Sequence, residues 1–294
     1  MRSLSILALL VLLLAACGGG SGGPDDPAAG TGVGSGGGGN TGGGGGGGGG
    51  LLPNPGPQIA LLLCNGHSPL PNYLATATGP QLEGALLGAG YTVQTSYFTD
   101  DLGGGAPGGY TDLVAKLQQI RDDWINGRSN PTRVVVVGHS HGCVRSHAAL
   151  RAVSDCPIRL LVDLDGSSAG WTLVTHGPEN AAMGGAPEGA YNINATITCS
   201  AFPTVASAPP PFDLEDVVFT HVEEAYEVRS ADMLIDPSNP PQLIPYDDRW
   251  NARPDGTTGG LTCYYSGLSH LEAGSPGVTL NAVQAWMLAR LAAD

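Results

Sequence analysis

The sequence predicts an α/β domain over residues 51–294, with a mostly parallel central sheet and helices on both faces. Strand and helix patterns alternate along this region, as they do where crossover helices join the strands of a parallel sheet. Several strand patterns are continuous apolar runs, which is typical of strands buried on both faces. A region of this length can bury one sizeable core, so we expect no second folded domain.

Five elements are expected in the first part of the domain. Each strand is indicated by an apolar or β-branched run, and each helix by apolar side chains recurring every three or four residues. In chain order they are a strand at 58–64, a helix at 81–87, a strand at 91–97, a helix marked by Leu113, Leu117, Ile120 and Trp124, and a strand at 133–137 with four consecutive valines.

The second part of the domain repeats this alternation around a long irregular stretch. We expect a helix at 143–153, strands at 158–162, 225–229 and 261–265, and a final helix at 279–293. Residues 167–220 are rich in Gly, Ala and Pro, and a stretch this long inside a domain is more often functional than plain loop. We interpret it as a cap in which Trp171, Phe202 and Phe212 could line an apolar pocket.

The first 50 residues are read as an export signal and a tether. Arg2 precedes a short apolar run, and Leu14-Ala15-Ala16-Cys17 resembles the lipobox of bacterial lipoproteins. That resemblance implies a signal peptide at 1–16 and acylation of Cys17, which would anchor the chain in the cell envelope, at the outer membrane or the cell surface. Residues 18–50 contain 21 glycines among 33 residues, and a flexible chain of this composition reaches about 30 Å.

The charge balance argues against a nucleic-acid partner. The net charge is −14, and only 12 Lys and Arg are present in the whole chain. A phosphate-binding surface needs clustered basic side chains. Neutral or apolar substrates fit this composition better.

The segment Gly138-His139-Ser140-His141-Gly142 is the clearest catalytic motif. It follows a predicted strand and precedes a predicted helix, which is the context a G-x-S-x-G nucleophile elbow requires. The strained turn exposes the serine, and the small residues allow the strand and the helix to pack closely. The alternative is a serine that only caps the helix. A metal site built from His139, His141 and Cys143 is disfavoured, because these side chains diverge in a helix and no carboxylate-His pair follows.

On this motif the chain resembles the α/β-hydrolase superfamily, especially its bacterial lipases and esterases. The resemblance implies that the backbone N–H of His141 is one oxyanion donor and that the loop after the first strand supplies the second. That loop reads Asn65-Gly66-His67, so His67 is the expected donor, although Asn stands where the family has His. No cofactor and no metal are expected; the oligomeric state is left open.

The family's chain order of Ser, acid and His selects the other two residues. Of the seven histidines, His270 lies after the last predicted strand and shortly before the final helix, where these folds place the base. Asp232 is the preferred acid, because 230–235 resembles the loop that carries it. Asp236 on the same loop and Asp165, at the end of the strand after the elbow, are the alternatives.

Five cysteines remain once Cys17 is assigned to lipid. In an oxidising compartment, two disulfides and one free thiol are expected. We favour Cys199 with Cys263 and Cys143 with Cys156, which leaves Cys64 as the buried free thiol.

The expected function is hydrolysis of carboxylic esters through an acyl-enzyme, with a small-molecule or lipid ester as substrate. Two alternatives remain at this point. One is an inactive hydrolase fold used as a surface-binding lipoprotein, and the other is an amidase, thioesterase or peptidase on the same fold.

Overall fold

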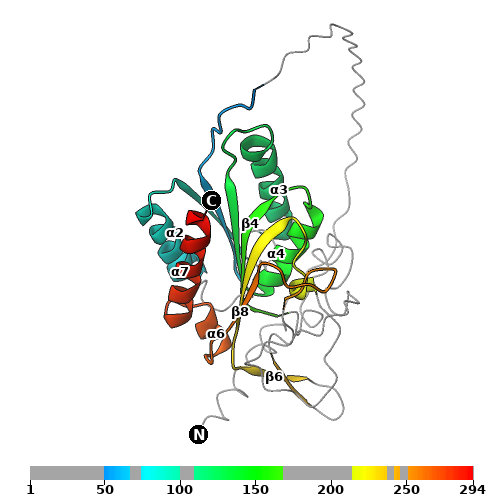
Figure 1. Ribbon diagram of the computed structural model, residues 1–294. Coiled ribbons are helices and arrows are strands. Elements are labelled where there is room, and N and C mark those ends of the chain that lie inside the picture. The colour runs from blue at the N-terminus through cyan, green and yellow to red at the C-terminus, as the bar shows by residue number, and fades with distance from the viewer. Residues whose placement is uncertain are drawn as a thin grey trace, which may run out of the picture. The chain divides into compact units, whose positions relative to one another are not determined.

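A six-stranded, all-parallel sheet forms the centre of the domain (Figure 1). The computed structural model describes residues 50–66, 74–99, 109–167, 214–236, 242–245 and 251–293. The strand order is β2-β1-β3-β4-β5-β8, with each neighbouring pair parallel. The strands are β1 (Ile59–Cys64), β2 (Val93–Phe98), β3 (Arg133–Ser140), β4 (Ile158–Gly166), β5 (Val222–Arg229) and β8 (Leu261–Tyr265).

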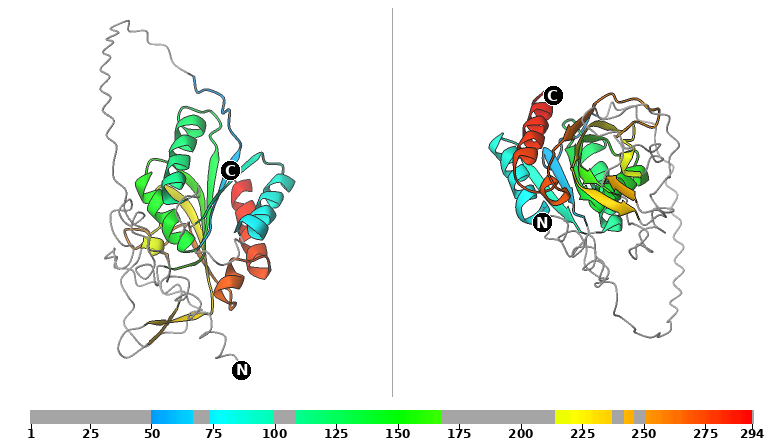
Figure 2. Two further views of the ribbon diagram at one scale, coloured as in Figure 1. Left: turned by 180° about the vertical axis from the view of Figure 1, so that it is seen from behind. Right: turned by 90° about the horizontal axis from the view of Figure 1, so that it is seen from below.

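Helices cover both faces of this sheet. Figures 1 and 2 show α3 and α4 on one face and α2 and α7 on the other. The helices are α2 (Gly79–Gly88), α3 (Tyr110–Ile120), α4 (His141–Ala152), the short α6 (His270–Ala273) and α7 (Val278–Ala292). The expected α/β fold class, with a parallel sheet between two helical layers, is therefore confirmed. Within the described residues no helix is both long and apolar enough to cross a membrane.

Smaller elements connect these parts. A π-helical turn (Leu74–Thr78) precedes α2, a second one (Arg121–Ile125) extends α3, and a 3-10 turn (Leu214–Asp216) precedes β5. Strands β6 (Met233–Asp236) and β7 (Gln242–Pro245) form a separate antiparallel pair. The sequence did not predict this pair or α6. Trp171, Phe202, Phe212 and most of the expected cap lie outside the described residues.

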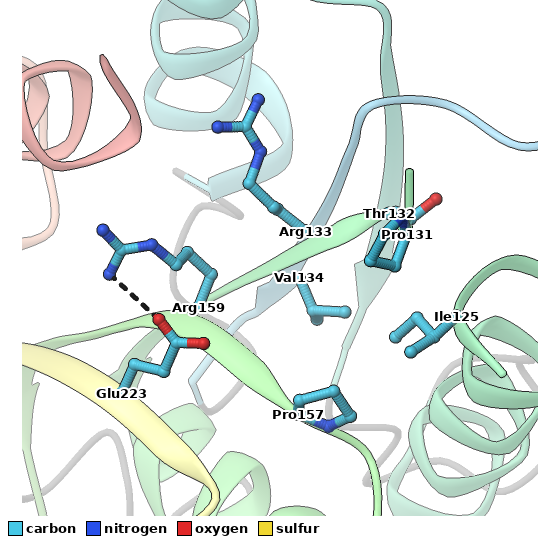
Figure 3. Close-up of a pocket in the computed structure, with 8 residues that line it drawn as sticks. All are labelled: Ile125, Pro131, Thr132, Arg133, Val134, Pro157, Arg159 and Glu223. Atoms are coloured by element: carbon cyan, nitrogen blue, oxygen red, sulfur yellow. Dashed lines mark ion pairs between the residues drawn. The ribbon is translucent and has the colours of Figure 1, made fainter. Parts of the chain in front are cut away.

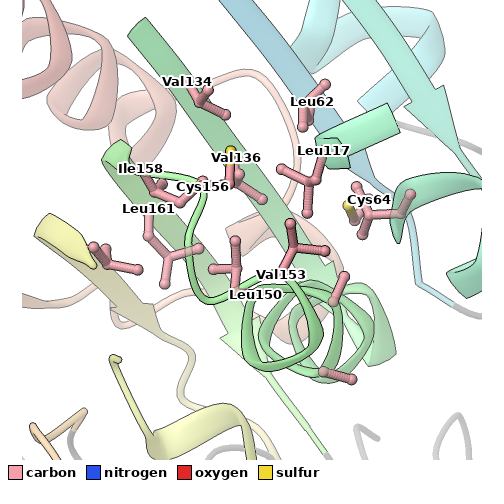
Figure 4. Close-up of a cluster of buried hydrophobic side chains, with 14 of the residues drawn as sticks. Leu62, Cys64, Leu117, Val134, Val136, Leu150, Val153, Cys156, Ile158 and Leu161 are labelled. Carbon is pink, nitrogen blue, oxygen red and sulfur yellow. The ribbon is translucent and has the colours of Figure 1, made fainter. Parts of the chain in front are cut away.

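The valines of β3 show why the sheet is buried on both sides. Side chains alternate across a strand, so Val134 and Val136 join one hydrophobic cluster and Val135 and Val137 join the other. Figure 4 shows the first cluster, in which Leu117 and side chains of α4 pack on β1, β3 and β4. The second cluster lies against α2 and α7. This double burial explains why the strands read as apolar runs rather than as an alternating pattern.

The cysteines are arranged differently from the expectation. Cys143 and Cys156 are both buried free thiols, so the predicted bond between them is wrong. From Cys143 to the end of α4 at Ala152 the helix rises about 14 Å, which exceeds the Cα–Cα reach of a disulfide, and Cys156 follows beyond that end. Cys64 is a buried free thiol, as expected. Cys263 is disulfide-bonded; Cys199, its predicted partner, lies outside the described residues.

Gly142 allows α4 to start directly against β1. A Cβ atom on Gly142 would lie 2.0 Å from the carbonyl oxygen of Cys64, which no side chain tolerates. Gly84, in the exposed interior of α2, has open space instead. The two glycines therefore form a matched pair for a stability measurement.

We expect Gly142→Ala to lower the free energy of unfolding by about 1–3 kcal/mol or more, because the added methyl forces α4 away from the sheet. Gly84→Ala should raise it by about 0.4–1 kcal/mol, because alanine restricts the unfolded chain without a clash. Urea denaturation of the purified variants measures both changes. A Gly142→Ala protein as stable as the native one would contradict this view of the helix–strand contact.

Candidate active site

Ser140 lies where β3 turns into α4, and its backbone is strained. Its φ and ψ are 55° and −131°, and α4 begins at the next residue, His141. A non-glycine residue in this region costs about 1–3 kcal/mol and marks a functional turn more often than an accident. The side chain is partly exposed, although the residues before it in β3 from Val134 onward are buried. The strand, strained serine and helix match the elbow expected from the sequence.

Close packing around the elbow explains its glycines. A Cβ on Gly138 would lie 2.7 Å from the Cα of Cys143, and Gly142 abuts β1 as described above. A Cβ on Gly66 would lie 2.7 Å from the Cβ of Ser140 and 3.3 Å from its Oγ. The loop after β1 therefore passes directly beside the serine. His67, the expected second oxyanion donor on that loop, lies outside the described residues.

The position of Ser140 in the sheet is the usual one for a ligand site. The chain runs from β1 outward to β2 and then returns to β3 on the other side of β1. In parallel sheets, ligands bind at the carboxyl ends of the strands where the strand order reverses in this way. Ser140 ends β3 at that point, beside the end of β1.

His270 is held at the same edge by two carboxylates. Its Nδ1–H donates to Asp165 Oδ2 at 2.5 Å, and its backbone N–H donates to Asp232 Oδ2 at 2.9 Å. His270 is the first residue of α6, and Ser269 and Glu272 form a capping box around that helix start. The imidazole and Asp165 are both nearly inaccessible to solvent. With the proton held on Nδ1, Nε2 is the basic nitrogen of the ring.

The two candidate acids make different contacts with His270. The sequence favoured Asp232, but this carboxylate contacts the backbone of His270, and the alternative, Asp165, contacts the ring. Asp165 has a φ of 54°, and among the described residues it shares positive φ outside glycine only with Ser140. The N–H of Ser230 donates to its other oxygen at 2.6 Å. Asp236 ends β6, and its side chain is not among those described.

His139 completes the described part of the site, and the sequence did not indicate a role for it. Its ring is stacked on that of His270, with 4.9 Å between centroids and 27° between planes. Its Nε2 lies 3.1 Å from the carbonyl oxygen of His270. The described residues contain no group of three or more His, Cys, Asp or Glu side chains arranged to bind a metal.

A second buried polar cluster lies between α4 and the sheet. His147 Nε2 contacts Asp163 Oδ2 at 3.0 Å, and Asn251 Nδ2 donates to the same oxygen at 2.8 Å. Burial alone would lower the pKa of His147, but the Asp163 carboxylate raises it overall. Glu227 accepts from the N–H of Asn251 at 2.7 Å and is ion-paired with Arg229. These contacts satisfy charges that would otherwise be costly to bury.

The cavity of about 190 Å³ in Figure 3 is not part of this site. Arg133, Arg159 and Glu223 line it, together with Pro131 and Pro157. These residues lie where β3, β4 and β5 begin, whereas Ser140 is the last residue of β3. The length of β3 places roughly 23 Å between the two edges.

His221 is too far from Ser140 to act as its base. Its backbone carbonyl accepts from the N–H of Ile158 at the start of β4, which is the edge of the sheet that carries the cavity.

Comparisons with known proteins found distant likenesses among solved structures. No family model and no curated protein matches the chain. Among solved structures, an α/β serine hydrolase without a lid from Xanthomonas campestris is 14% identical, covering 82% of this chain and 85% of its own, with a TM-score of 0.41. The esterase of Pyrobaculum calidifontis is 11% identical, covering 82% and 76%, with a TM-score of 0.42. Est1E from Butyrivibrio proteoclasticus is 15% identical, covering 80% and 88%, with a TM-score of 0.40. Likenesses of this size do not bear on function, which is argued below from the geometry alone.

The two carboxylates around His270 can be distinguished without any assay of activity. The buried Nδ1–H in its short bond to Asp165 should give a far-downfield proton resonance in the NMR spectrum. We expect Asp165→Asn to abolish this resonance, because the amide cannot accept in the same way as a carboxylate. Asp232→Asn should keep it, since Asp232 contacts only the backbone N–H. The opposite result in the two variants would show that Asp232 faces the ring.

Proposed function

We propose that the chain is a serine hydrolase that cleaves carboxylic esters, with Ser140 as nucleophile, His270 as general base and Asp165 as the acid that orients it. The observation that carries the proposal is the convergence of a strained serine and a buried His–Asp pair at one edge of the sheet. A nucleophilic serine needs an exposed position on a rigid support and a base oriented by a third group. The described residues supply both.

The reaction follows from these positions. Ser140 Oγ attacks the ester carbonyl carbon and transfers its proton to Nε2 of His270, while Asp165 stabilises the resulting imidazolium. The oxygen of the tetrahedral intermediate accepts from backbone N–H groups, for which His141 at the start of α4 is well placed. His270 then gives its proton to the departing alcohol. A water molecule, deprotonated by His270, releases the acid from Ser140.

An ester is favoured over an amide as substrate because of the composition and the expected setting of the protein. The chain is acidic and poor in charge, with 13% Asp, Glu, Lys and Arg, which suits neutral or apolar substrates. Attachment near a membrane would bring it close to lipid and other hydrophobic esters. We therefore propose that hydrophobic acyl groups are preferred.

Hydrolysis of p-nitrophenyl esters of increasing acyl length tests this function. The native protein should turn over these esters, and Ser140→Ala and His270→Ala should each lose about 10⁴-fold or more in kcat, because the two side chains act as a unit. Circular dichroism of each variant controls for folding. If the native protein turned over no ester, or if His270→Ala kept activity close to native, the assignment would be wrong.

We also propose that lipid on Cys17 tethers the enzyme to the cell envelope. The support is the sequence Leu14-Ala15-Ala16-Cys17 and the glycine-rich stretch that follows it. Several acyl chains on one residue are sufficient for stable membrane attachment. The glycine-rich stretch would allow the catalytic domain to reach substrates beyond the membrane surface.

Expression in a bacterium with subcellular fractionation tests the tether. The native protein should be found with the membranes. Cys17→Ser should carry no lipid and should accumulate either as the uncleaved precursor or in the soluble fraction. Cys64→Ser is a matched control, because Cys64 is buried in β1 and has no part in the anchor. A Cys17→Ser protein that stayed fully lipidated would contradict the proposal.

A further inference from the structure

His139 contacts the proposed base in two ways but takes part in no step of the reaction. It is the residue before Ser140, and only 4% of its surface is exposed. One contact is the ring stack on His270, and the other joins its Nε2 to the carbonyl oxygen of the same residue. The contacts therefore reach both the side chain and the backbone of His270.

The protonation state of His139 follows from its partner. A carbonyl oxygen can only accept, so Nε2 of His139 carries the proton and donates it. Burial lowers the pKa of His139 to about 4, and the nearby His270 acts in the same direction. The ring is consequently neutral near neutral pH. A neutral aromatic face can lie against an imidazolium without repulsion, whereas a second cation could not.

Gly274 fixes the ring of His139 from another direction. A Cβ on Gly274 would lie 2.6 Å from Cδ2 of this ring. The φ of Gly274 is −89°, which any residue can adopt, so the conformation of the backbone does not require glycine here. Its carbonyl oxygen accepts from the Thr78 hydroxyl at 2.6 Å, which ties it to the body of the domain. The space at Gly274 therefore serves to seat the ring of His139.

We propose that His139 is a positioning residue for His270, and that it keeps the imidazole in the orientation that Ser140 requires. The changes in kcat expected from this role rest on the proposed function. His270 is then held by three side chains: Asp165 at Nδ1, Asp232 at the backbone N–H, and His139 at the carbonyl and the ring face. Within this set, His139 makes the contacts with the face of the His270 ring and with the backbone carbonyl oxygen of His270.

Substitutions at His139 separate its two contacts. His139→Ala removes both, and we expect kcat to fall about 10–100-fold with KM changed less than about twofold, because a misplaced base slows chemistry without weakening binding. His139→Gln can still donate to the carbonyl, and His139→Phe keeps only the stack, so each should recover part of kcat. His147→Phe is the matched control: it removes another buried imidazole bonded to a backbone carbonyl, that of Val217, and should cost stability while leaving kcat within about twofold.

A double-mutant cycle tests the same inference by displacing the ring of His139 from a neighbouring position. Gly274→Ala should displace His139 and lower kcat by about tenfold in the native background, but by less than about twofold in His139→Ala, where there is no ring to displace. Gly277→Ala is the control, because a Cβ there meets nothing within 4 Å. Equal effects of Gly274→Ala in the two backgrounds would overturn the proposal, as would a folded His139→Ala protein with native kcat.

The NMR resonance of the His270 Nδ1–H separates this inference from the proposed function. It should broaden or shift in His139→Ala and in Gly274→Ala, and should be unchanged in His147→Phe and Gly277→Ala. This measurement needs no substrate. If the native protein hydrolysed no ester but the resonance responded in this way, the function would fail and the positioning role would stand. An unchanged resonance in His139→Ala would refute the positioning role whatever the activity.

Discussion

The turn at Ser140 is the constraint on which the rest of the site depends. The chain must leave a buried strand and enter a helix within one residue, and the backbone of Ser140 takes a positive φ to do so. This geometry is possible only because Gly138 and Gly142 let α4 lie against β3 and β1 without intervening side chains. The cost of the strained residue is about 1–3 kcal/mol and is offset by the two apolar clusters that hold the sheet and helices together. The result is a hydroxyl exposed on a rigid support.

The position of His270 depends on a different principle, namely several contacts from separate segments to one residue. His270 is in a four-residue helix, which has little stability of its own. Its place is set instead by Asp165 from β4, by Asp232 from the segment after β5, and by His139 from β3. The peptide N–H of Ala231 also donates to the carbonyl of Leu268, which ties these two segments together. His270 is therefore held by neighbours from β3, β4 and the segment after β5 rather than by its own helix.

Much of the fold could be predicted because the strong patterns have a direct physical cause. The four valines of β3 face two hydrophobic layers, and the apolar face of α3 packs on the sheet, so both elements appear in the sequence as plain periodicities. Ser140 and His270 could be proposed because the elbow is a local motif and the family that the chain resembles places its base after the acid, near the final helix. The capping box of Ser269 and Glu272 was a usable signal for α6 that the sequence interpretation did not use.

The contacts of Asp165 and His139 with His270 could not be predicted for a shared reason. Asp165 lies near the end of β4 and Asp232 follows β5, and both carboxyl ends lie at the same edge, so chain order alone does not decide which one faces the ring. That choice depends on side-chain directions at the ends of β4 and β5. The contact of His139 with His270 joins residues 131 positions apart and has no sequence signature. The predicted disulfide between Cys143 and Cys156 is wrong because most of α4 separates the two thiols.

The most direct test of the central claim is to identify the residue that reacts with a fluorophosphonate, which phosphonylates activated serines. The native protein would be incubated with the reagent, digested, and mapped by mass spectrometry. We predict a single adduct per molecule on Ser140, because its hydroxyl lies on a partly exposed turn and the proposed base lies at the same edge of the sheet. An unmodified protein, or an adduct on another serine such as Ser146 or Ser167, would contradict the claim.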